Sequence, residues 1–211
     1  MQIRKKVSFM KIKICGLTSP AEAEYLNRNH VDFAGMVLFF PKSKRNISPE
    51  QASRIMQALD KNIRKVAVVV APSLSEIRQL EALGFDYLQI HGAVSAEMLP
   101  AIHTPILKAF NVADMEQYDF YHRCPQIAGY VFDAHEPGSG KTFNWSLVTQ
   151  IPRDEKLLFL AGGLHCDNVQ EAIAHVHPDG VDVSSGVEYP DRPGKDPVRI
   201  DLFIQRVRTA P

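Results

Sequence analysis

Short β-rich runs alternate along the chain with segments that have helical periodicity. Alternating or continuous apolar residues, rich in valine and isoleucine, predict strands at 11–15, 33–39, 65–70, 86–90, 105–110, 129–133, 157–161 and 180–184. A segment long enough for a helix follows each run. Strand then helix, repeated eight times, predicts parallel strands joined by helical crossovers.

Serine residues mark the beginnings of three predicted helices. Ser19, Ser48 and Ser73 are each followed three residues later by glutamate or glutamine, which is the spacing of a capping box. Proline follows the first two serines, at the position where a helix tolerates it best. Apolar residues recur at helical spacing within 52–59 and 200–207. We therefore expect each helix to bury one apolar stripe.

Two architectures accept this alternation: an open doubly wound sheet and a closed eight-stranded barrel. Eight repeats fit into 211 residues with little length to spare, which favours the barrel. No G-x-G-x-x-G sequence follows the first strand, as a dinucleotide-binding sheet would require. We expect a single-domain (β/α)8 TIM barrel over residues 11–211, preceded by an N-terminal extension over residues 1–10.

Charge and composition narrow the class of partner. The 24 basic and 24 acidic side chains cancel, and no block of like charges stands out, so nucleic acid and membrane surfaces are not expected as partners. No run approaches the ~20 apolar residues of a membrane span, and the first ten residues lack the apolar core of a signal peptide. These features predict a cytoplasmic protein, and they leave open a small neutral or anionic metabolite as its ligand.

The three cysteines are odd in number and widely spaced, at Cys15, Cys124 and Cys166. Without a C-x-x-C pair they indicate neither a disulfide framework nor a zinc site, and we expect no metal. A lone free cysteine is more often packing than chemistry, and we interpret Cys124 and Cys166 in this way. Cys15 differs because it ends the first predicted strand.

Chemically useful residues gather where predicted strands end. Active sites of parallel barrels lie at the carboxyl ends of the strands. The residues at or just beyond these ends are Cys15, Arg45, His91, Asp133, Gly162, Gly163, Ser184, Ser185 and Gly186. Capping is not the expected role of Asp133, because the next predicted helix begins only near Asn144.

Six motifs in order resemble those of the phosphoribosylanthranilate isomerase family. They are KICGLT at 13–18, PKSKRNISPEQA at 41–52, LQIHG at 88–92, GSGKTFNW at 138–145, LAGGL at 160–164 and VDVSSGVE at 181–188. The resemblance extends from about Lys11 to the last helix. It implies a cofactor-free Amadori rearrangement of N-(5-phosphoribosyl)anthranilate to 1-(2-carboxyphenylamino)-1-deoxyribulose 5-phosphate, in tryptophan biosynthesis.

The resemblance implies that Cys15 is the general base and Asp133 the general acid. The acid protonates the ribose ring oxygen, and the base removes the C2′ proton. A free thiol has a pKa near ~8.5, so Cys15 needs a positive or hydrogen-bonding environment to become a thiolate. An ordinary aspartic acid has a pKa of about 3.9, so Asp133 needs burial or a nearby negative charge to keep its proton.

The ends of the substrate have separate expected partners. Arg45 suits the anthranilate carboxylate, because a guanidinium group pairs with a carboxylate through two hydrogen bonds, whereas Lys42 and Lys44 are expected to be solvated. Barrels commonly bind phosphate at the loops after strands seven and eight, which are 162–163 and 184–186 here.

Two residues keep two interpretations each. His91 is either a substrate contact or a packed histidine whose nitrogens are satisfied by the backbone. Asp182 is either near the substrate in an orienting role, as the resemblance implies, or a structural hydrogen-bond centre. The segment 138–142, GSGKT, lacks the spacing of a nucleotide P-loop, and in the family it is a mobile loop able to cover the substrate.

Three other functions stay open. An indole-glycerol-phosphate synthase needs a catalytic lysine together with glutamates at strand ends, and no such glutamates accompany the strand-end Lys108. A histidine-pathway isomerase uses paired aspartates, whereas strand one offers a cysteine. A barrel that binds a phosphosugar without catalysis remains, although the presence of both Cys15 and Asp133 argues against it. The expected assembly is a monomer or a homodimer.

Overall fold

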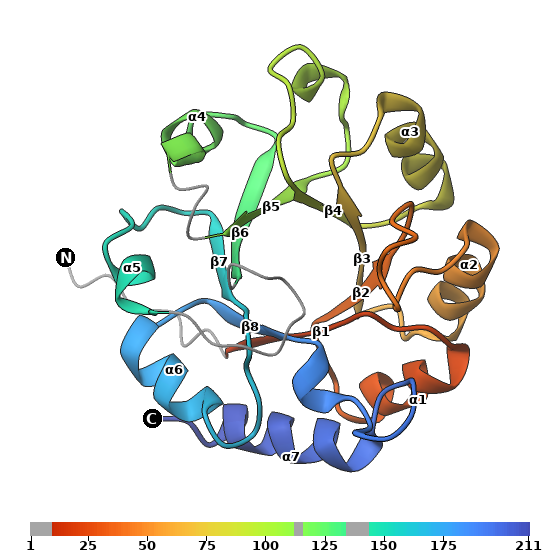
Figure 1. The fold of residues 1–211 in the computed structure, drawn as a ribbon, viewed down its shortest axis with the longest axis vertical. Coiled ribbons are helices and arrows are strands. Elements are labelled where there is room, and N and C mark those ends of the chain that lie inside the picture. The colour runs from red at the N-terminus through yellow and green to blue at the C-terminus, as the bar shows by residue number, and fades with distance from the viewer. Residues whose placement is uncertain (1–9, 112–115, 134–143) are drawn as a thin grey trace.

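The computed structural model describes residues 10–111, 116–133 and 144–211, and it shows a closed parallel barrel with strands in sequence order (Figure 1). The strands are β1 (Lys11–Cys15), β2 (Phe33–Val37), β3 (Arg64–Val70), β4 (Tyr87–His91), β5 (Ile106–Asn111), β6 (Ile127–Asp133), β7 (Leu157–Leu160) and β8 (Gly180–Val183). β1 pairs with both β2 and β8, which closes the barrel. The predicted TIM barrel is confirmed, whereas residues 1–9 of the proposed extension lie outside the described residues.

Three strands end earlier than predicted, and in β7 the difference is the single residue Ala161. The run 33–39 stops at Val37, and Phe39 has a φ of 56°, a left-handed conformation that an extended strand cannot contain. The run 180–184 stops at Val183, since Ser184 turns into a short 3₁₀ helix, η3 (Ser185–Val187). Both turns redirect the chain at the carboxyl end of the barrel.

The helices surround the barrel (Figure 1). They are α1 (Pro20–Arg28), α2 (Pro49–Ala58), α3 (Leu74–Leu83), α4 (Tyr118–His122), α5 (Ser146–Thr149), α6 (Val169–Val176) and α7 (Pro197–Arg208). The three predicted capping boxes are present. In α2, for example, Ser48 Oγ accepts from Gln51 N at 3.2 Å while Ser48 N donates to Gln51 Oε1 at 3.0 Å. No helix among the described residues is long and apolar enough to span a membrane.

One connection departs from the predicted strand–helix alternation. Between β4 and β5 the chain forms only a 3₁₀ turn, η1 (Leu99–Ala101), and no α-helix. Pro100 stands in the first turn, where a helix tolerates proline, but Pro105 disfavours helical backbone at Thr104, so a helix is unable to continue to β5. The expectation of a helix after every strand is therefore wrong at this connection.

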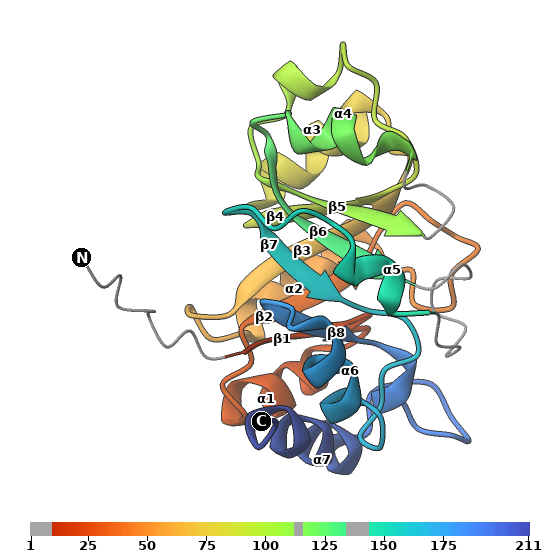
Figure 2. The same ribbon diagram turned by 90° about the vertical axis from the view of Figure 1, so that its left-hand side faces the viewer.

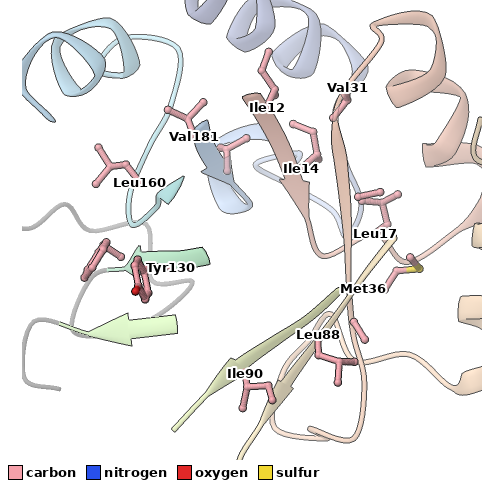
Figure 3. Close-up of a cluster of buried hydrophobic side chains, with 14 of the residues drawn as sticks. Ile12, Ile14, Leu17, Val31, Met36, Leu88, Ile90, Tyr130, Leu160 and Val181 are labelled. Carbon is pink, nitrogen blue, oxygen red and sulfur yellow. The ribbon is translucent and has the colours of Figure 1, made fainter. Parts of the chain in front are cut away.

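Apolar side chains form two clusters on either side of the sheet. The larger lies between strands and helices and includes Ile12, Ile14 and Val181 (Figure 3). The smaller fills the inside of the barrel and includes Cys15, Val68 and other strand residues. Because side chains alternate between the two faces of a strand, residues two positions apart share a face.

This alternation brings polar side chains into the barrel. On β1, Lys13 and Cys15 both face the interior of the barrel. On β4, Gln89 and His91 do the same, and on β8 the side chain of Asp182 faces the interior. Lys13, Gln89 and Asp182 are all buried. The strands run toward one end of the barrel (Figure 2), so these groups lie beneath the loops that follow the strands.

Candidate active site

The carboxyl ends of the strands surround a cavity of about 770 Å³. The predicted residues in its wall are Cys15, Arg45, His91, Asp133, Gly162, Gly163, Asp182, Ser184 and Ser185. They come from both ends of the sequence and meet because the barrel closes between β1 and β8. The structure thus brings nearly all of the predicted site residues into one space.

Gly186 is the exception, since it is not part of the cavity wall. A Cβ at this position would lie 2.1 Å from the carbonyl oxygen of Leu164. Glycine therefore allows the loop after β8 to pack against the loop after β7. Its role is to hold two cavity loops together.

Cys15 ends β1 and faces Gly35 of β2 across the strand pair. A Cβ at position 35 would lie 2.9 Å from Cys15 Sγ and 3.1 Å from Lys13 Nζ. The thiol and the ammonium group therefore share the space that glycine leaves open. The sequence assigned no role to Lys13 or Gly35, although the two-residue spacing of Lys13 and Cys15 already placed them on one face.

The electrostatic environment of Cys15 is only partly as expected. The positive groups are present, since Lys13 and Lys195 both favour the thiolate and lower the pKa of the thiol. Burial nevertheless dominates and raises the pKa of the Cys15 thiol above its usual range. Burial and the Asp182 carboxylate thus oppose the effect of the two cations on the Cys15 thiol, and the activation of Cys15 stays a prediction.

Lys13 and Asp182 form a buried ion pair, with Nζ 2.8 Å from Oδ2. Burial alone lowers the pKa of the Lys13 ammonium, but the Asp182 carboxylate and Cys15 leave it raised. Lys13 accordingly stays charged next to the thiol. Asp182 is a structural hydrogen-bond partner of Lys13 and also lines the cavity, whereas its orienting role toward the substrate stays a prediction.

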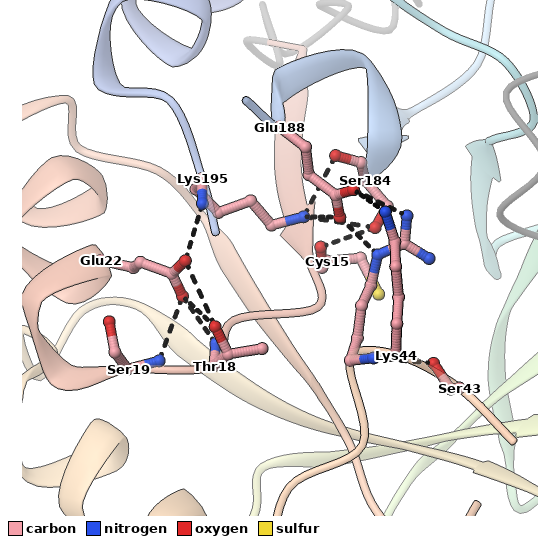
Figure 4. Close-up of polar contacts among 10 residues, drawn as sticks. Cys15, Thr18, Ser19, Glu22, Ser43, Lys44, Ser184, Glu188 and Lys195 are labelled. Carbon is pink, nitrogen blue, oxygen red and sulfur yellow. Dashed lines mark hydrogen bonds and ion pairs between the residues drawn. The ribbon is translucent and has the colours of Figure 1, made fainter. Parts of the chain in front are cut away.

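Ser184 connects the end of β8 to the end of β1. Its hydroxyl donates to the carbonyl oxygen of Cys15 at 2.9 Å. Lys195 Nζ donates to the carbonyl and hydroxyl oxygens of Ser184 at 3.1 and 3.3 Å, and to Glu188 Oε1 at 3.2 Å (Figure 4). The Ser184 hydroxyl thus fixes the position of Cys15. Because this hydroxyl is already engaged, a phosphate beside Ser184 would contact the main chain of Ser184.

Arg45 is held by Glu188 through two hydrogen bonds, from Nε to Oε1 at 2.5 Å and from Nη2 to Oε2 at 3.1 Å. Lys44 is solvated as expected, with a side chain that is 71% exposed, and its ammonium group also lies 2.8 Å from Glu188. Burial raises the pKa of Glu188, but Arg45, Lys195 and Lys44 outweigh burial and lower it to about 2. Glu188 ends the VDVSSGVE motif, yet the sequence predicted no role for it.

Gly16 makes room for Arg45. Its φ is +82°, and a Cβ there would lie 2.4 Å from Arg45 Cδ. A side chain at position 16 would therefore be strained and would displace the guanidinium group. The glycine directly after Cys15 thus sets the position of a residue on a different loop.

His91 is a neutral histidine in the cavity wall. Burial, with added repulsion from Lys108 and Lys13, lowers its pKa to about 4. Its Nε2 lies 3.0 Å from Nε2 of Gln89. The hydrogen-bond partner of His91 Nε2 is thus the Gln89 side chain. The interpretation of His91 as a packed histidine had required a backbone group instead.

Asp133 ends β6 and reaches the same cavity as Cys15. Strands β7 and β8 lie between β6 and β1, so the two groups approach the cavity from separate directions. The cavity therefore places one carboxyl and one thiol on separate parts of its wall.

The loop after β7 brings its backbone to the cavity. Gly162 and Gly163 have φ angles of +81° and +64°, conformations that favour glycine. Asn168 Nδ2 donates to the Gly163 carbonyl oxygen at 2.9 Å and so fixes the turn. The absence of side chains at 162 and 163 lets a ligand approach the main chain closely.

The remaining predicted residues lie elsewhere. Lys108 is buried on the outer face of β5, between the barrel and the helices. Its Nζ donates to the Ala109 carbonyl oxygen at 2.5 Å and lies 4.7 Å from the centre of the Phe110 ring. Cys124 and Cys166 are free cysteines that do not line the cavity. The segment 138–142 lies outside the described residues.

Comparison with known proteins identifies relatives over the whole barrel. A family model described as N-(5′-phosphoribosyl)anthranilate (PRA) isomerase matches residues 12–206. The N-(5′-phosphoribosyl)anthranilate isomerase of Geotalea uraniireducens is 39% identical over 204 residues, which cover 94% of this chain and 98% of the relative. The N-(5′-phosphoribosyl)anthranilate isomerase of Streptococcus gordonii is 37% identical over 203 residues, which cover 94% of this chain and 97% of the relative.

Solved structures agree with the sequence relatives. The phosphoribosyl anthranilate isomerase of Thermotoga maritima has a TM-score of 0.82 at 36% identity, covering 94% of this chain and 98% of that chain. A phosphoribosyl anthranilate isomerase in complex with reduced 1-(o-carboxyphenylamino)-1-deoxyribulose 5-phosphate has a TM-score of 0.79 at 34% identity, with the same coverage. By sequence and by structure, this chain belongs to the N-(5′-phosphoribosyl)anthranilate isomerase family.

Proposed function

We propose that this barrel is the phosphoribosylanthranilate isomerase of tryptophan biosynthesis, with Cys15 and Asp133 as its base and acid. The observation that carries the proposal is that both groups line one cavity, from β1 and β6. Family membership and the end-to-end match to isomerases support the activity. The roles of individual residues follow from their places in the cavity wall.

Ring opening is the first step. The Asp133 carboxylic acid donates its proton to the ribose ring oxygen while the bond between C1′ and that oxygen breaks, and the anthranilate nitrogen forms an iminium. This step needs a protonated carboxyl, which a substrate phosphate or carboxylate nearby favours by repelling the ionised form.

Proton removal is the second step. The Cys15 thiolate takes the proton from C2′, the electron pair moves toward the iminium nitrogen, and an enolamine forms that then becomes the ketone. Lys13 beside Sγ stabilises the thiolate electrostatically. Both steps move only protons and electron pairs within one substrate, so the reaction requires no metal or redox cofactor.

The ends of the substrate are held by separate parts of the wall. Backbone N–H groups of 162–163 and 184–185, which line the cavity, are proposed to bind the phosphate at the loops after β7 and β8. Arg45 is proposed to bind the anthranilate carboxylate. Glu188 occupies the Nε and Nη2 edge of the guanidinium group, so the carboxylate is expected at the side carrying Nη1. His91 and Asp182 complete the contacts with the sugar.

We also infer a cytoplasmic location and a monomeric or homodimeric assembly. The free thiols Cys15, Cys124 and Cys166, which a reducing compartment maintains, support the location, as does the biosynthetic family. For the assembly, one related structure at 35% identity contains monomers generated from the dimeric isomerase of Thermotoga maritima.

One assay tests the activity directly. Purified protein is mixed with freshly prepared phosphoribosylanthranilate, and the loss of substrate fluorescence is followed. Turnover that depends on protein concentration is expected. Tight binding of reduced 1-(o-carboxyphenylamino)-1-deoxyribulose 5-phosphate without any turnover would instead indicate the alternative, a barrel that binds a phosphosugar without converting it.

A further inference from the structure

Lys195 is a buried lysine behind the cavity to which the proposed mechanism gives no role. Its side chain is 1% exposed, and it is not among the described residues that line the cavity. Nζ donates to Ser184 O at 3.1 Å, to Ser184 Oγ at 3.3 Å and to Glu188 Oε1 at 3.2 Å. An ammonium group has three N–H donors, and these three acceptors occupy all of them. Lys195 therefore acts through the residues that it holds and not by contact with a ligand.

The contacts with Ser184 connect Lys195 to Cys15. The Ser184 hydroxyl has one proton, which it donates to the Cys15 carbonyl oxygen at 2.9 Å. Because an ammonium group only donates, Lys195 contacts the oxygen of this hydroxyl and leaves its proton directed at Cys15. Lys195 thus fixes the direction of the hydrogen bond that holds the end of β1.

The contact with Glu188 connects Lys195 to Arg45. Glu188 Oε1 accepts from both Lys195 Nζ and Arg45 Nε, at 3.2 and 2.5 Å. Although burial raises the pKa of Glu188, the Arg45 hydrogen bond and the charge of Lys195, together with Lys44, lower it to about 2. The charge of Lys195 thus helps to keep Glu188 in the ionised form that holds the guanidinium group.

The main chain of Lys195 is held from a third direction. Its N–H donates to Glu22 Oε1 at 2.7 Å, and Glu22 Oε2 accepts from Thr18 N at 2.6 Å (Figure 4). Thr18 belongs to the loop after β1, and Lys195 to the loop after β8. The two loops therefore meet at one carboxylate, which holds the lysine in place.

We propose that Lys195 is a positioning residue that couples two parts of the site: it holds Cys15 through Ser184 and Arg45 through Glu188. Treating Cys15 as the base and Arg45 as the carboxylate anchor rests on the proposed function. The coupling itself rests on the hydrogen bonds around one buried ammonium group. The base and the anchor thereby keep a fixed relation to each other, on which the orientation of a bound substrate depends.

The charge of Lys195 gives the proposal a readout that a merely structural role would not produce. Burial raises the pKa of the Cys15 thiol, Lys13 and Lys195 lower it, and Asp182 raises it further. Loss of the Lys195 charge therefore lowers the thiolate population. Loosened packing around the thiol would instead relieve burial and raise that population. The two effects change the reactivity of Cys15 in opposite directions.

The test uses two measurements that need no turnover. One is the rate constant for alkylation of Cys15 at neutral pH, with the site located by mass spectrometry. The other is the calorimetric affinity for reduced 1-(o-carboxyphenylamino)-1-deoxyribulose 5-phosphate. Lys195→Met keeps the length of the side chain and removes the ammonium group. Lys156→Met is the matched control, because half-buried Lys156 donates to the carbonyl oxygens of His122 and Cys124, which are not among the described residues of the cavity wall.

We expect Lys195→Met to slow the alkylation of Cys15 about threefold or more, because the thiolate is the reactive form. It should also weaken the reduced ligand about five- to tenfold, because Arg45 is held less firmly. In an Arg45→Ala background the same substitution should cost at least about threefold less affinity, since residues that act through one another are not additive. Lys156→Met should change neither measurement. Unchanged or faster alkylation in Lys195→Met, or an equal loss of affinity with and without Arg45, would overturn the proposal.

A measurement on wild-type protein makes the test independent of variant stability. Burial lowers the pKa of the Lys195 ammonium, so its charge at neutral pH depends on the acceptors around it. NMR of protein with isotope-labelled lysine should show a charged Lys195 ammonium whose protons exchange slowly with water, and a neutral amine would overturn the proposal. Failure of the proposed function looks different, since wild-type protein would then show no turnover of phosphoribosylanthranilate, whatever the state of Lys195.

Discussion

Gly35 lies opposite Cys15 in the first strand pair, and the missing side chain leaves the space in which Sγ and Lys13 Nζ meet. A Cβ at this position would be 2.9 Å from the sulfur, closer than such atoms approach in practice. The placement of the proposed base therefore depends on a residue of the neighbouring strand that has no chemistry of its own.

Gly35→Ala is expected to lower kcat/KM at least about tenfold, because the methyl group must displace the thiol or the ammonium group, and small displacements of reacting groups are costly. Steady-state kinetics measure the loss. Thermal unfolding serves as the control, since overpacking also costs stability, about 1–3 kcal/mol. A variant with normal kcat/KM would show that the site tolerates a different position of Cys15.

Cys15→Ser is expected to reduce kcat by about 10²-fold or more, since an alcohol is a far poorer proton acceptor near neutral pH. Cys124→Ser and Cys166→Ser are matched controls outside the cavity and should change kcat little. Alkylation at Cys15, located by mass spectrometry, should abolish turnover, and the reduced sugar ligand should slow it. Full activity of Cys15→Ser would remove the base from the mechanism.

Burial raises the pKa of the Cys15 thiol, so the thiolate gains population only above the ordinary thiol range, near ~8.5. In the free protein, kcat/KM and the rate of alkylation should therefore rise with pH, with a midpoint above that value. Lys13→Met removes a cation that favours the thiolate, so the midpoint should move further up. A wild-type midpoint well below the ordinary thiol range would contradict the raised pKa.

Asp133→Asn is expected to keep the fold and the affinity for the reduced ligand but to lose about 10²–10⁴-fold in kcat, because an amide cannot donate the required proton. Calorimetry and turnover are measured on the same preparation. Activity close to that of wild type would exclude Asp133 as the acid.

Arg45→Ala is expected to raise KM far more than it lowers kcat, because a carboxylate anchor contributes to ground-state and transition-state binding alike. Lys44→Ala is the control, since the largely exposed Lys44 contacts the same Glu188. An unchanged KM in Arg45→Ala would show that the substrate carboxylate binds elsewhere.

The alternation of strands and the capping boxes were sufficient to predict the barrel, since both depend on local patterns. The helix expected between β4 and β5 did not form, and only the short turn η1 stands in its place, before Pro105. Among site residues, those at strand ends were predicted because the fold itself places such positions at the cavity.

Residues inside the strands were missed for a physical reason. Lys13 meets Asp182 across a separation of 169 residues, and only barrel closure brings them together. A lysine in an alternating strand usually indicates a solvent-facing side, whereas both faces of a parallel barrel strand are buried. The raised pKa of Cys15 was missed likewise, because it depends on a balance between burial and two cations on separate segments.

The hydrogen bond from Ser184 to the Cys15 carbonyl oxygen, and the Lys195 contacts behind it, join the first strand to the last loop. During synthesis on the ribosome, Cys15 emerges long before either partner exists. A chain that still lacks residues 184–195 is unable to make these contacts, so they do not yet fix its Cys15 in place. Once the barrel has closed, Cys15 is buried and less accessible to oxidants. Rapid closure therefore protects the thiol of the proposed base as well as the fold.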